Sequence, residues 1–166
     1  MAKSKIALAA NDAWNILNYR AGLIRSLQDA GYEIAVLAPE GEHGDSVRSL
    51  GVEFYPVAMS ARGRSPADLA VLLNFWKRLR AIRPAAFLGF TAKPNIYGSM
   101  AAGFCGVPVI NNVSGLGAAF MRPGALRQLV ERLYRIALRR SATVFFQNSD
   151  DLDLFVERGI VSPKQA

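Results

Sequence analysis

The 166-residue chain has one cysteine and one histidine, and this scarcity excludes several kinds of site. Cys105 stands in the apolar run GSMAAGFCGV, with no histidine, cysteine or acid at metal-ligand spacing. We interpret it as a small buried hydrophobic residue that forms no disulfide, which fits a reducing compartment. His43 lies in the polar segment PEGEHGDS, and no Ser-His-Asp, Cys-His or metal-ligand set can be assembled with it. No metal is expected.

The chain also lacks the common phosphate-binding fingerprints. The first predicted strand-to-helix turn reads AANDAWNIL and holds no G-x-G-x-x-G, and no G-x-x-x-x-G-K-[ST] occurs anywhere. These absences argue against a nicotinamide-binding or P-loop protein. Acids are few as well: 13 Asp and Glu stand against 20 Lys and Arg, a net charge of +7. That excess favours an anionic partner such as nucleic acid, a phosphorylated substrate or an acidic membrane face.

Long apolar helices and a signal peptide are not expected either. The N-terminus, MAKSKIALAAND, has too short an apolar stretch for a signal peptide. Residues 94 to 121 carry no charge, but they include two prolines, several glycines and five Asn or Ser residues. We interpret this segment as helix, strand and loop in a protein core rather than a membrane span. The hydrophobic share of 51% is that of a folded globular chain, and the length of 166 residues fits a single domain.

Six apolar runs alternate with helix-like segments along the chain. The predicted strands are 6–10, 33–39, 52–57, 85–90, 107–112 and 142–148. The predicted helices are 14–31, 44–50, 66–84, 94–106, 125–140 and 150–159. Strands without polar alternation, joined by helices, indicate a parallel sheet covered on both faces. The fold class is therefore α/β, a single Rossmann-like doubly wound parallel sheet.

With the usual strand order 3-2-1-4-5-6, the first and fourth strands are neighbours, and ligands bind at their carboxyl ends. The segments AANDAWN and FTAKPNIYG leave those two strands, and NNVSGLG leaves the fifth. The residues expected to rim this crevice are Asn11, Asp12, Thr91, Lys93, Asn95 and the loop with Ser114, Gly115 and Gly117. The crevice is the predicted binding site.

Two features of this crevice, and Arg20 in the first predicted helix, admit two interpretations each. Lys93 precedes Pro94 at the start of a helix, where free amides favour an anion; the alternative is a solvated loop lysine. Ser-Gly-Leu-Gly at 114 to 117 permits close backbone approach to a ligand, or forms a tight turn. Arg20 faces an anion, or it is a surface arginine in a salt bridge.

The helix predicted over 125–140 is amphipathic and strongly basic. A solvated outer face is one interpretation; a surface that meets anionic lipid headgroups is the other, favoured by nearby apolar residues. The residues assigned to a membrane-facing surface are Phe120, Met121, Arg132, Arg135 and Arg139. The segment LLNFWKRLRAIR at 72–83 has a similar mixture, with Trp76 and four basic residues.

Several segments together resemble the N-terminal domain of retaining family 4 glycosyltransferases, which have a GT-B fold of two Rossmann-like domains. They are N-x-x-N-Y-R, A-G-Y-E-I-A-V-L-A-P, F-T-A-K-P-N-I-Y-G, N-N-V-S-G-L-G-A-A-F and V-F-F-Q-N-S-D-D. The resemblance is greatest to bacterial enzymes that add sugars to undecaprenyl-diphosphate-linked glycans, and it spans residues 5–160. Relatives often have Thr or Glu where this chain has Ser114.

The resemblance implies that residues 1–166 form the acceptor-binding domain and that a C-terminal nucleotide-sugar-binding domain is absent from this chain. It implies that Arg20, Lys93, Asn95 and the Gly115–Gly117 loop line the acceptor diphosphate and sugar. The implied partners are a lipid-linked glycan, an anionic membrane surface and the missing donor domain, with no nucleic acid. No cofactor is expected on this domain; a nucleotide-sugar donor is expected for the full-length enzyme.

The resemblance thus implies a retaining sugar transfer to a polyprenyl-diphosphate glycan, in bacterial surface polysaccharide or glycoprotein assembly. The expected location is cytoplasmic, peripheral on the inner face of the bacterial plasma membrane. Two alternatives remain: a domain of a GT-B sugar-nucleotide epimerase, and a non-enzymatic anion-binding Rossmann module. An epimerase requires acid and base residues in the crevice, whereas a nucleic-acid-binding module predicts salt-sensitive DNA binding.

Overall fold

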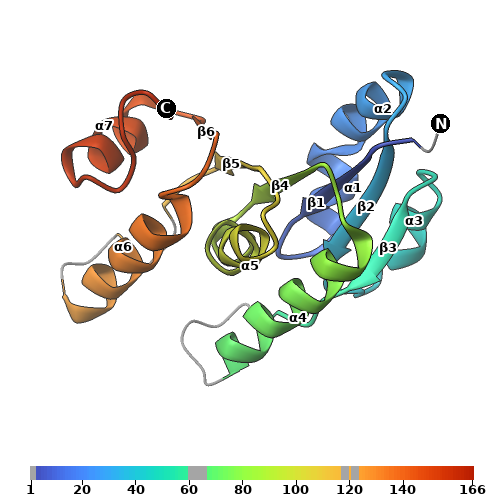
Figure 1. Cartoon of the computed structure of the whole chain (residues 1–166), viewed down its shortest axis with the longest axis horizontal. Coiled ribbons are helices and arrows are strands. Elements are labelled where there is room, and N and C mark those ends of the chain that lie inside the picture. The colour runs from blue at the N-terminus through green and yellow to red at the C-terminus, as the bar shows by residue number, and fades with distance from the viewer. Residues whose placement is uncertain (1–2, 60–66, 117–119, 121–123) are drawn as a thin grey trace.

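The computed structural model of the chain describes residues 3–59, 67–116, 120 and 124–166. Within these residues a six-stranded sheet has the order β3-β2-β1-β4-β5-β6 (Figure 1), and every neighbouring pair is parallel. The strands are β1 (Lys5–Ala9), β2 (Glu33–Ala38), β3 (Glu53–Pro56), β4 (Ala86–Phe90), β5 (Val109–Val113) and β6 (Thr143–Phe146). The predicted doubly wound sheet and its strand order are confirmed.

Helices connect the strands as the sequence predicts, with two differences. The helices are α1 (Ala13–Tyr19), α2 (Ala21–Asp29), α3 (Gly44–Arg48), α4 (Ala67–Ile82), η1 (Pro94–Gly98), α5 (Ser99–Phe104), α6 (Ala125–Leu138) and α7 (Ser149–Glu157). The first predicted helix is broken at Arg20, whose φ of −122° and ψ of −5° leave the helical region. The helix predicted over 94–106 opens with a π-helical turn, η1, a rare form that is frequent at functional sites.

Both faces of the sheet are covered, which explains the unbroken apolar strands. Alternate residues of β1 point to opposite faces. Ile6 and Leu8 join a core cluster with α1 to α3, whereas Ala7 and Ala9 join a cluster with α4 and α5. A third cluster forms where α6 and α7 pack beside β6, and Figure 1 shows these two helices at the β6 end of the sheet.

The charge-free segment that begins at residue 94 folds as predicted, into η1, α5, β5 and the start of a loop, as far as residue 116. Its core positions are occupied by small residues, such as Ala101 and Ala102, which are fully buried against β4 and α4. Across the described ranges, no helix is both long and apolar enough to span a bilayer.

Candidate functional site

The carboxyl edge of the sheet is where the segments leaving β1 and β4 meet, as predicted. The backbone amide of Asn11 donates to the Thr91 hydroxyl, 3.1 Å away, and Asn11 is exposed. Thr91 has a φ of +67°. A β-branched residue in this left-handed region is strained, and such strain is concentrated at functional sites. The exits of the two neighbouring strands are therefore tied together at the expected place.

Arg20 lies at this edge. Its guanidinium carbon is 4.2 Å from the centre of the Phe90 ring, at the last residue of β4. Its Nε is buried, and no described residue accepts a hydrogen bond from it; no carboxylate in the described ranges pairs with the side chain. Burial lowers the pKa of Arg20 from its usual value. The structure therefore places the Arg20 side chain at the crevice, which the sequence pattern alone did not decide.

Two asparagines not singled out from the sequence also have unsatisfied atoms near this edge. Among the described residues, the buried side-chain atoms without a hydrogen-bond partner are Asn15 Oδ1, Arg20 Nε and Asn112 Oδ1. Asn112 is the register partner of Phe90, so the two side chains point to the same face of the sheet. Asn15 belongs to α1, directly after β1. Buried polar atoms without partners are costly, and their gathering at one edge indicates a binding site.

Lys93 is at the crevice but is not a free cation. Its Nζ is 2.7 Å from Asp68 Oδ1, and the two side chains are only 17% and 16% exposed. The Tyr97 hydroxyl donates to the other carboxylate oxygen, Asp68 Oδ2, at 3.0 Å. Burial, together with this bond, raises the pKa of Tyr97 to about 12. The expectation of an open anion site at Lys93 needs correction, because a carboxylate neutralises the ammonium.

A cavity of about 450 Å³ lies beside this ion pair. It is lined by Pro39, Ala58, Met59, Asp68, Ala70, Val71, Asn74 and Lys93. Pro39 follows β2 and Ala58 follows β3, so the cavity lies at the carboxyl edge of the sheet. Asp68 enters it from the first turn of α4. Sequence reasoning missed Asp68, which is 25 positions from Lys93.

Asn95 lies below the crevice rather than on its rim. It is 1% exposed, its Nδ2 donates to the Asn112 carbonyl and its Oδ1 accepts from Asn111 Nδ2, both at 2.9 Å. Its backbone amide, expected to be free, donates to the Thr91 carbonyl at 3.0 Å. The rim position predicted for Asn95 is wrong, because these bonds draw its side chain into the interior between β4 and β5.

Fully buried Asn111 is the centre of this polar network. It also donates to Ser99 Oγ at 2.8 Å and accepts from Ser141 Oγ at 2.7 Å. A Cβ placed on Gly89 would come within 2.7 Å of Asn95 Oδ1, so this strand position has no room for a side chain. The network fixes the start of η1, and hence Lys93, relative to the end of β5.

The loop after β5 is exposed where the structure describes it. Ser114 and Gly115 are both exposed, and Gly115 has a φ of +129°, a conformation that favours glycine. At Ser114 and Gly115, the predicted glycine loop therefore leaves the carboxyl edge exposed to solvent. Gly117 lies outside the described residues. No cluster of potential metal ligands occurs in the part of the chain that the structure describes.

The surface predicted to face a membrane is not formed as expected around α6. Phe120 is 7% exposed and stacks on Phe155 with ring centres 5.8 Å apart, so its assignment to the membrane is wrong. Arg135 donates to the carbonyls of Arg158 and Gly159, at 2.7 and 3.0 Å, and so caps the end of α7. Arg132 and Arg139 are exposed. Met121 is outside the described residues.

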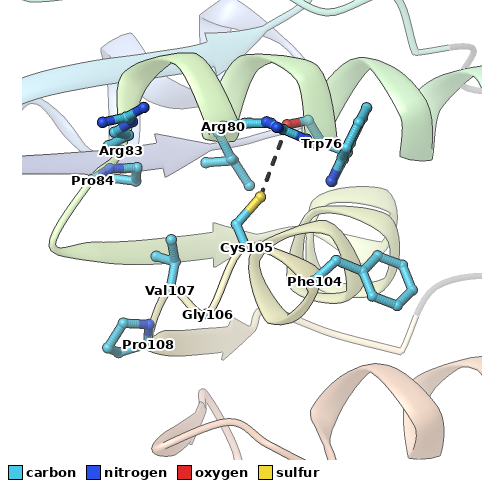
Figure 2. A pocket seen from close by; sticks show the side chains of 10 residues that line it. Trp76, Arg80, Arg83, Pro84, Phe104, Cys105, Gly106, Val107 and Pro108 are labelled. Atoms are coloured by element: carbon cyan, nitrogen blue, oxygen red, sulfur yellow. Dashed lines mark hydrogen bonds between the residues drawn. The ribbon is translucent and has the colours of Figure 1, made fainter.

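A different surface combines exposed apolar and basic side chains at the amino edge of the sheet, where the strands begin. Figure 2 shows the end of α4, with Trp76, Arg80 and Arg83, beside the end of α5, with Phe104 and Cys105, and the Cys105 thiol points toward α4. These residues line a hollow of about 510 Å³. Cys105 is only partly buried, and burial raises the pKa of its thiol. Phe104 is 71% exposed.

Phe104 also borders a second hollow, of about 300 Å³, with Ile136, Arg139 and Arg140 of α6 and the turn that follows it. Ile136 is 63% exposed. The residues lining the two hollows include four arginines and no carboxylate. We call Trp76, Arg80, Arg83, Phe104, Ile136, Arg139 and Arg140 the amino-edge surface.

The outer side of α4 connects this surface with the candidate site. Leu69 and Leu73 are 63% and 47% exposed and are followed by Trp76, a spacing that places the three on one helix face. The helix runs from the carboxyl edge, where Asp68 lines the cavity, to the amino edge, where β4 begins. An exposed apolar stripe therefore links the two edges.

Comparisons with known proteins give relatives of this chain. It is 23% identical to the N,N'-diacetylbacillosaminyl-diphospho-undecaprenol alpha-1,3-N-acetylgalactosaminyltransferase of Campylobacter jejuni, over 96% of this chain and 44% of that protein. Acinetobacter baumannii MurG has a similar fold, with a TM-score of 0.59 and 17% identity over 87% of this chain and 41% of its own. The chain thus spans less than half the length of these relatives.

The fold is also similar to that of a UDP-GlcNAc 2-epimerase from Neisseria meningitidis, with a TM-score of 0.66 and 18% identity over 96% of this chain and 45% of the epimerase. At such identities the solved structures show a shared fold alone. The family comparison is more specific, since it matches residues 16–166, which include Arg20, Lys93 and the Ser114–Gly115 loop. The chain belongs to the family of glycosyl transferase 4-like domains.

Proposed function

We propose that this chain is the acceptor-binding domain of a glycosyltransferase, and that its acceptor is a glycan carried on a polyprenyl diphosphate. The observation that carries the proposal is Arg20, a guanidinium stacked on Phe90 with a buried Nε that no described residue satisfies. Arginine binds phosphate oxygens through charge-assisted hydrogen bonds. The Campylobacter relative is named for a diphospho-undecaprenol acceptor, which supports the same chemistry here.

The open backbone at Ser114 and Gly115 is the second part of the proposed acceptor site. Both residues leave β5 next to the strand that ends at Phe90. Backbone amides of such a loop can approach a diphosphate closely, since glycine adds no side chain. The nucleotide-sugar donor would be held by a further domain, as in a two-domain GT-B enzyme, and transfer would retain configuration. We expect residues 1–166 alone to transfer no sugar; robust transfer by this purified chain would contradict that expectation.

The proposal includes an anionic membrane as the place where the acceptor is met, on the inner face of the bacterial plasma membrane. The surface best suited to it is α4 with the amino-edge surface, which keeps Arg139 of the surface first predicted but not Phe120 or Arg135. Phe104 is exposed beside arginines with no lining carboxylate, and Leu69 and Leu73 are exposed apolar residues further along α4. Apolar tips enter a lipid interface while arginines attract anionic headgroups. Because α4 begins at the cavity by Asp68, lipid contact along this helix leaves the carboxyl edge next to the membrane.

Vesicle co-sedimentation tests the proposal. Three vesicle types are compared at low and high salt: neutral, anionic, and anionic doped with an undecaprenyl-diphosphate sugar. We expect anionic vesicles to bind the chain, and the doped ones to bind it more tightly. Arg20→Ala should abolish only the increment from the dopant. Phe104→Ser should weaken binding to all anionic vesicles, whereas Phe145→Ser, at a phenylalanine that is 55% exposed on β6, should not. Equal binding to doped and undoped vesicles would contradict the acceptor assignment.

A sugar-nucleotide epimerase is the second candidate, favoured by the fold shared with the Neisseria epimerase. Such an enzyme requires acid and base groups that face a nucleotide sugar. At the exit of β1, however, Asp12 caps α1 by accepting from the Asn15 amide, and Asp68, at the start of α4, is held by Lys93. Titration with UDP-N-acetylglucosamine, followed by NMR, separates the two functions. Binding to the carboxyl edge of this chain alone would favour the epimerase.

A further inference from the structure

We infer that the cavity beside Lys93 is a subsite for a neutral saccharide ring, in which Asp68 accepts hydrogen bonds from sugar hydroxyls and Lys93 donates to one. The inference deepens the proposed function, because it assigns the saccharide part of the acceptor to a place separate from Arg20. The cavity measures about 450 Å³. That volume lies within the ~300–1,000 Å³ of typical small-molecule sites.

The charge of the cavity decides which ligand it suits. Asp68 and Lys93 form a neutral pair at 2.7 Å with little solvent around either group. A phosphate entering here would meet a carboxylate whose repulsion offsets the attraction of the ammonium. A hydroxyl both donates and accepts, so it can satisfy the carboxylate and the ammonium together. The pair therefore suits neutral vicinal hydroxyls better than an anion.

The carboxylate is also held in a fixed orientation, and its bonds to the described residues leave acceptor capacity over. Lys93 takes one oxygen and Tyr97 the other, and both partners come from the segment at η1, while Asp68 belongs to α4. A carboxylate has about four lone-pair sites, of which these two bonds use two. The remaining sites are on a group that lines the cavity. Fixed polar groups that can still accept hydrogen bonds favour specific binding, because the protein loses little conformational freedom when the ligand binds.

The rest of the cavity wall is apolar or amide. Met59 and Val71 supply apolar surface, and Val71 is 3% exposed, so its position is set by the core. Asn74 adds an exposed amide one turn further along α4. A sugar ring presents C–H groups on its faces and hydroxyls at its edge. A wall of this composition matches both kinds of surface, as expected for a site with a few placed polar groups.

Arg20 and Asp68 are on different sides of the sheet. Phe90, under Arg20, packs in the cluster with α1 to α3, whereas Asp68 and Lys93 meet on the α4 side. The crevice therefore has, on one side, a cation that no described carboxylate pairs with and, on the other, a neutral polar pair. A phosphorylated glycan has matching parts: a dianionic diphosphate and an uncharged sugar.

NMR titration of the full 166-residue chain tests this division with two probes, methyl N-acetylglucosaminide and inorganic pyrophosphate. We expect the glycoside to shift the backbone amides of residues 68–74 and 93, and pyrophosphate to shift those around Arg20. Asp68→Asn should lower the glycoside affinity about tenfold or more. The same substitution frees the Lys93 ammonium, so pyrophosphate should now bind at the cavity.

These opposite changes separate a lost subsite from a damaged fold, which would weaken both probes. Tyr97→Phe keeps the ion pair and removes one bond to the carboxylate, so it should weaken the glycoside by about threefold. Glu40→Gln, in the exposed Glu40–Arg48 pair, is the matched control and should change neither titration. Glycoside shifts that avoid residues 68–74, or wild-type glycoside binding by Asp68→Asn, would overturn the subsite. If the glycoside bound as expected but pyrophosphate did not bind near Arg20, the result would contradict the proposed function and leave the subsite standing.

Discussion

The two edges of the sheet both carry basic and polar groups, yet they hold them in different ways. At the carboxyl edge each of the two cations is held by a specific neighbour, Arg20 by Phe90 and Lys93 by Asp68. At the amino edge, Arg80 lies over the Trp76 ring, but Phe104 and Ile136 project into solvent beside arginines with no lining carboxylate. Oriented groups suit a ligand of defined shape, whereas loosely held ones suit a deformable surface such as a lipid headgroup layer.

The buried network under the carboxyl edge should give the largest effect on stability. Asn111→Leu removes the partner of Asn95, Ser99 and Ser141, which are all nearly inaccessible to water. We expect it to lower the unfolding free energy by about 3 kcal/mol or more, measured by urea denaturation. Asn18→Ala, at an exposed asparagine of α1, should cost less than about 0.5 kcal/mol. Similar urea midpoints for the two variants would show that the buried network does not stabilise the carboxyl edge.

Within the carboxyl edge, replacing Arg20 tests the difference between its two cations. Arg20→Lys keeps the charge but loses the planar group that stacks on Phe90 and presents parallel donors. We expect pyrophosphate affinity, measured by calorimetry, to fall about tenfold. Lys93→Met should leave that affinity within about twofold, because Lys93 and Asp68 lie on the other side of the sheet from Arg20. If the two substitutions weakened pyrophosphate equally, the two cations would belong to one anion site.

The location of this site could be predicted from the sequence because it depends on chain order. Alternating apolar runs and helices set the strand order, and that order places the exits of β1 and β4 side by side, where Asn11 and Thr91 are bonded. The arginine stacked on Phe90 could not be derived in this way. It depends on the break between α1 and α2, which no proline marks, and the nearby Gly22 lies inside α2 rather than at the break.

Pairings between distant segments were beyond sequence reasoning for a physical reason. Asp68 and Lys93 are brought together by the packing of α4 against η1, and neither periodicity nor local spacing encodes such a contact. Phe120 illustrates the same limit. An apolar residue before a basic helix is compatible with a lipid interface or with a core, and the choice is made by Phe155, 35 positions away in α7. Surface assignments based on composition alone therefore fail where a later helix covers the residue.

At the amino edge, single arginines should have moderate effects that depend on salt. Arg80→Ala is expected to weaken binding to anionic vesicles about fivefold at low salt, because each basic residue near an anionic surface contributes about 1 kcal/mol. Arg25→Ala removes an equal charge from exposed α2, on the other face of the sheet, and should change binding by less than about twofold. Equal losses would mean that net charge, rather than this surface, attracts the vesicle.

The smallest effect concerns the pH dependence of the carboxyl edge. Burial and the bond to Asp68 raise the pKa of Tyr97 to about 12 from the 10.0 of an unperturbed tyrosine. The unfolded chain therefore releases this proton more readily, so Tyr97 makes folding stability fall as pH rises from about 10 to 12. Tyr97→Phe should make the decline of the unfolding free energy shallower in that interval. Part of the decline should remain in this variant, because complete burial also raises the pKa of Tyr134. An unchanged slope would indicate that the Tyr97 hydroxyl is not held by Asp68 in solution.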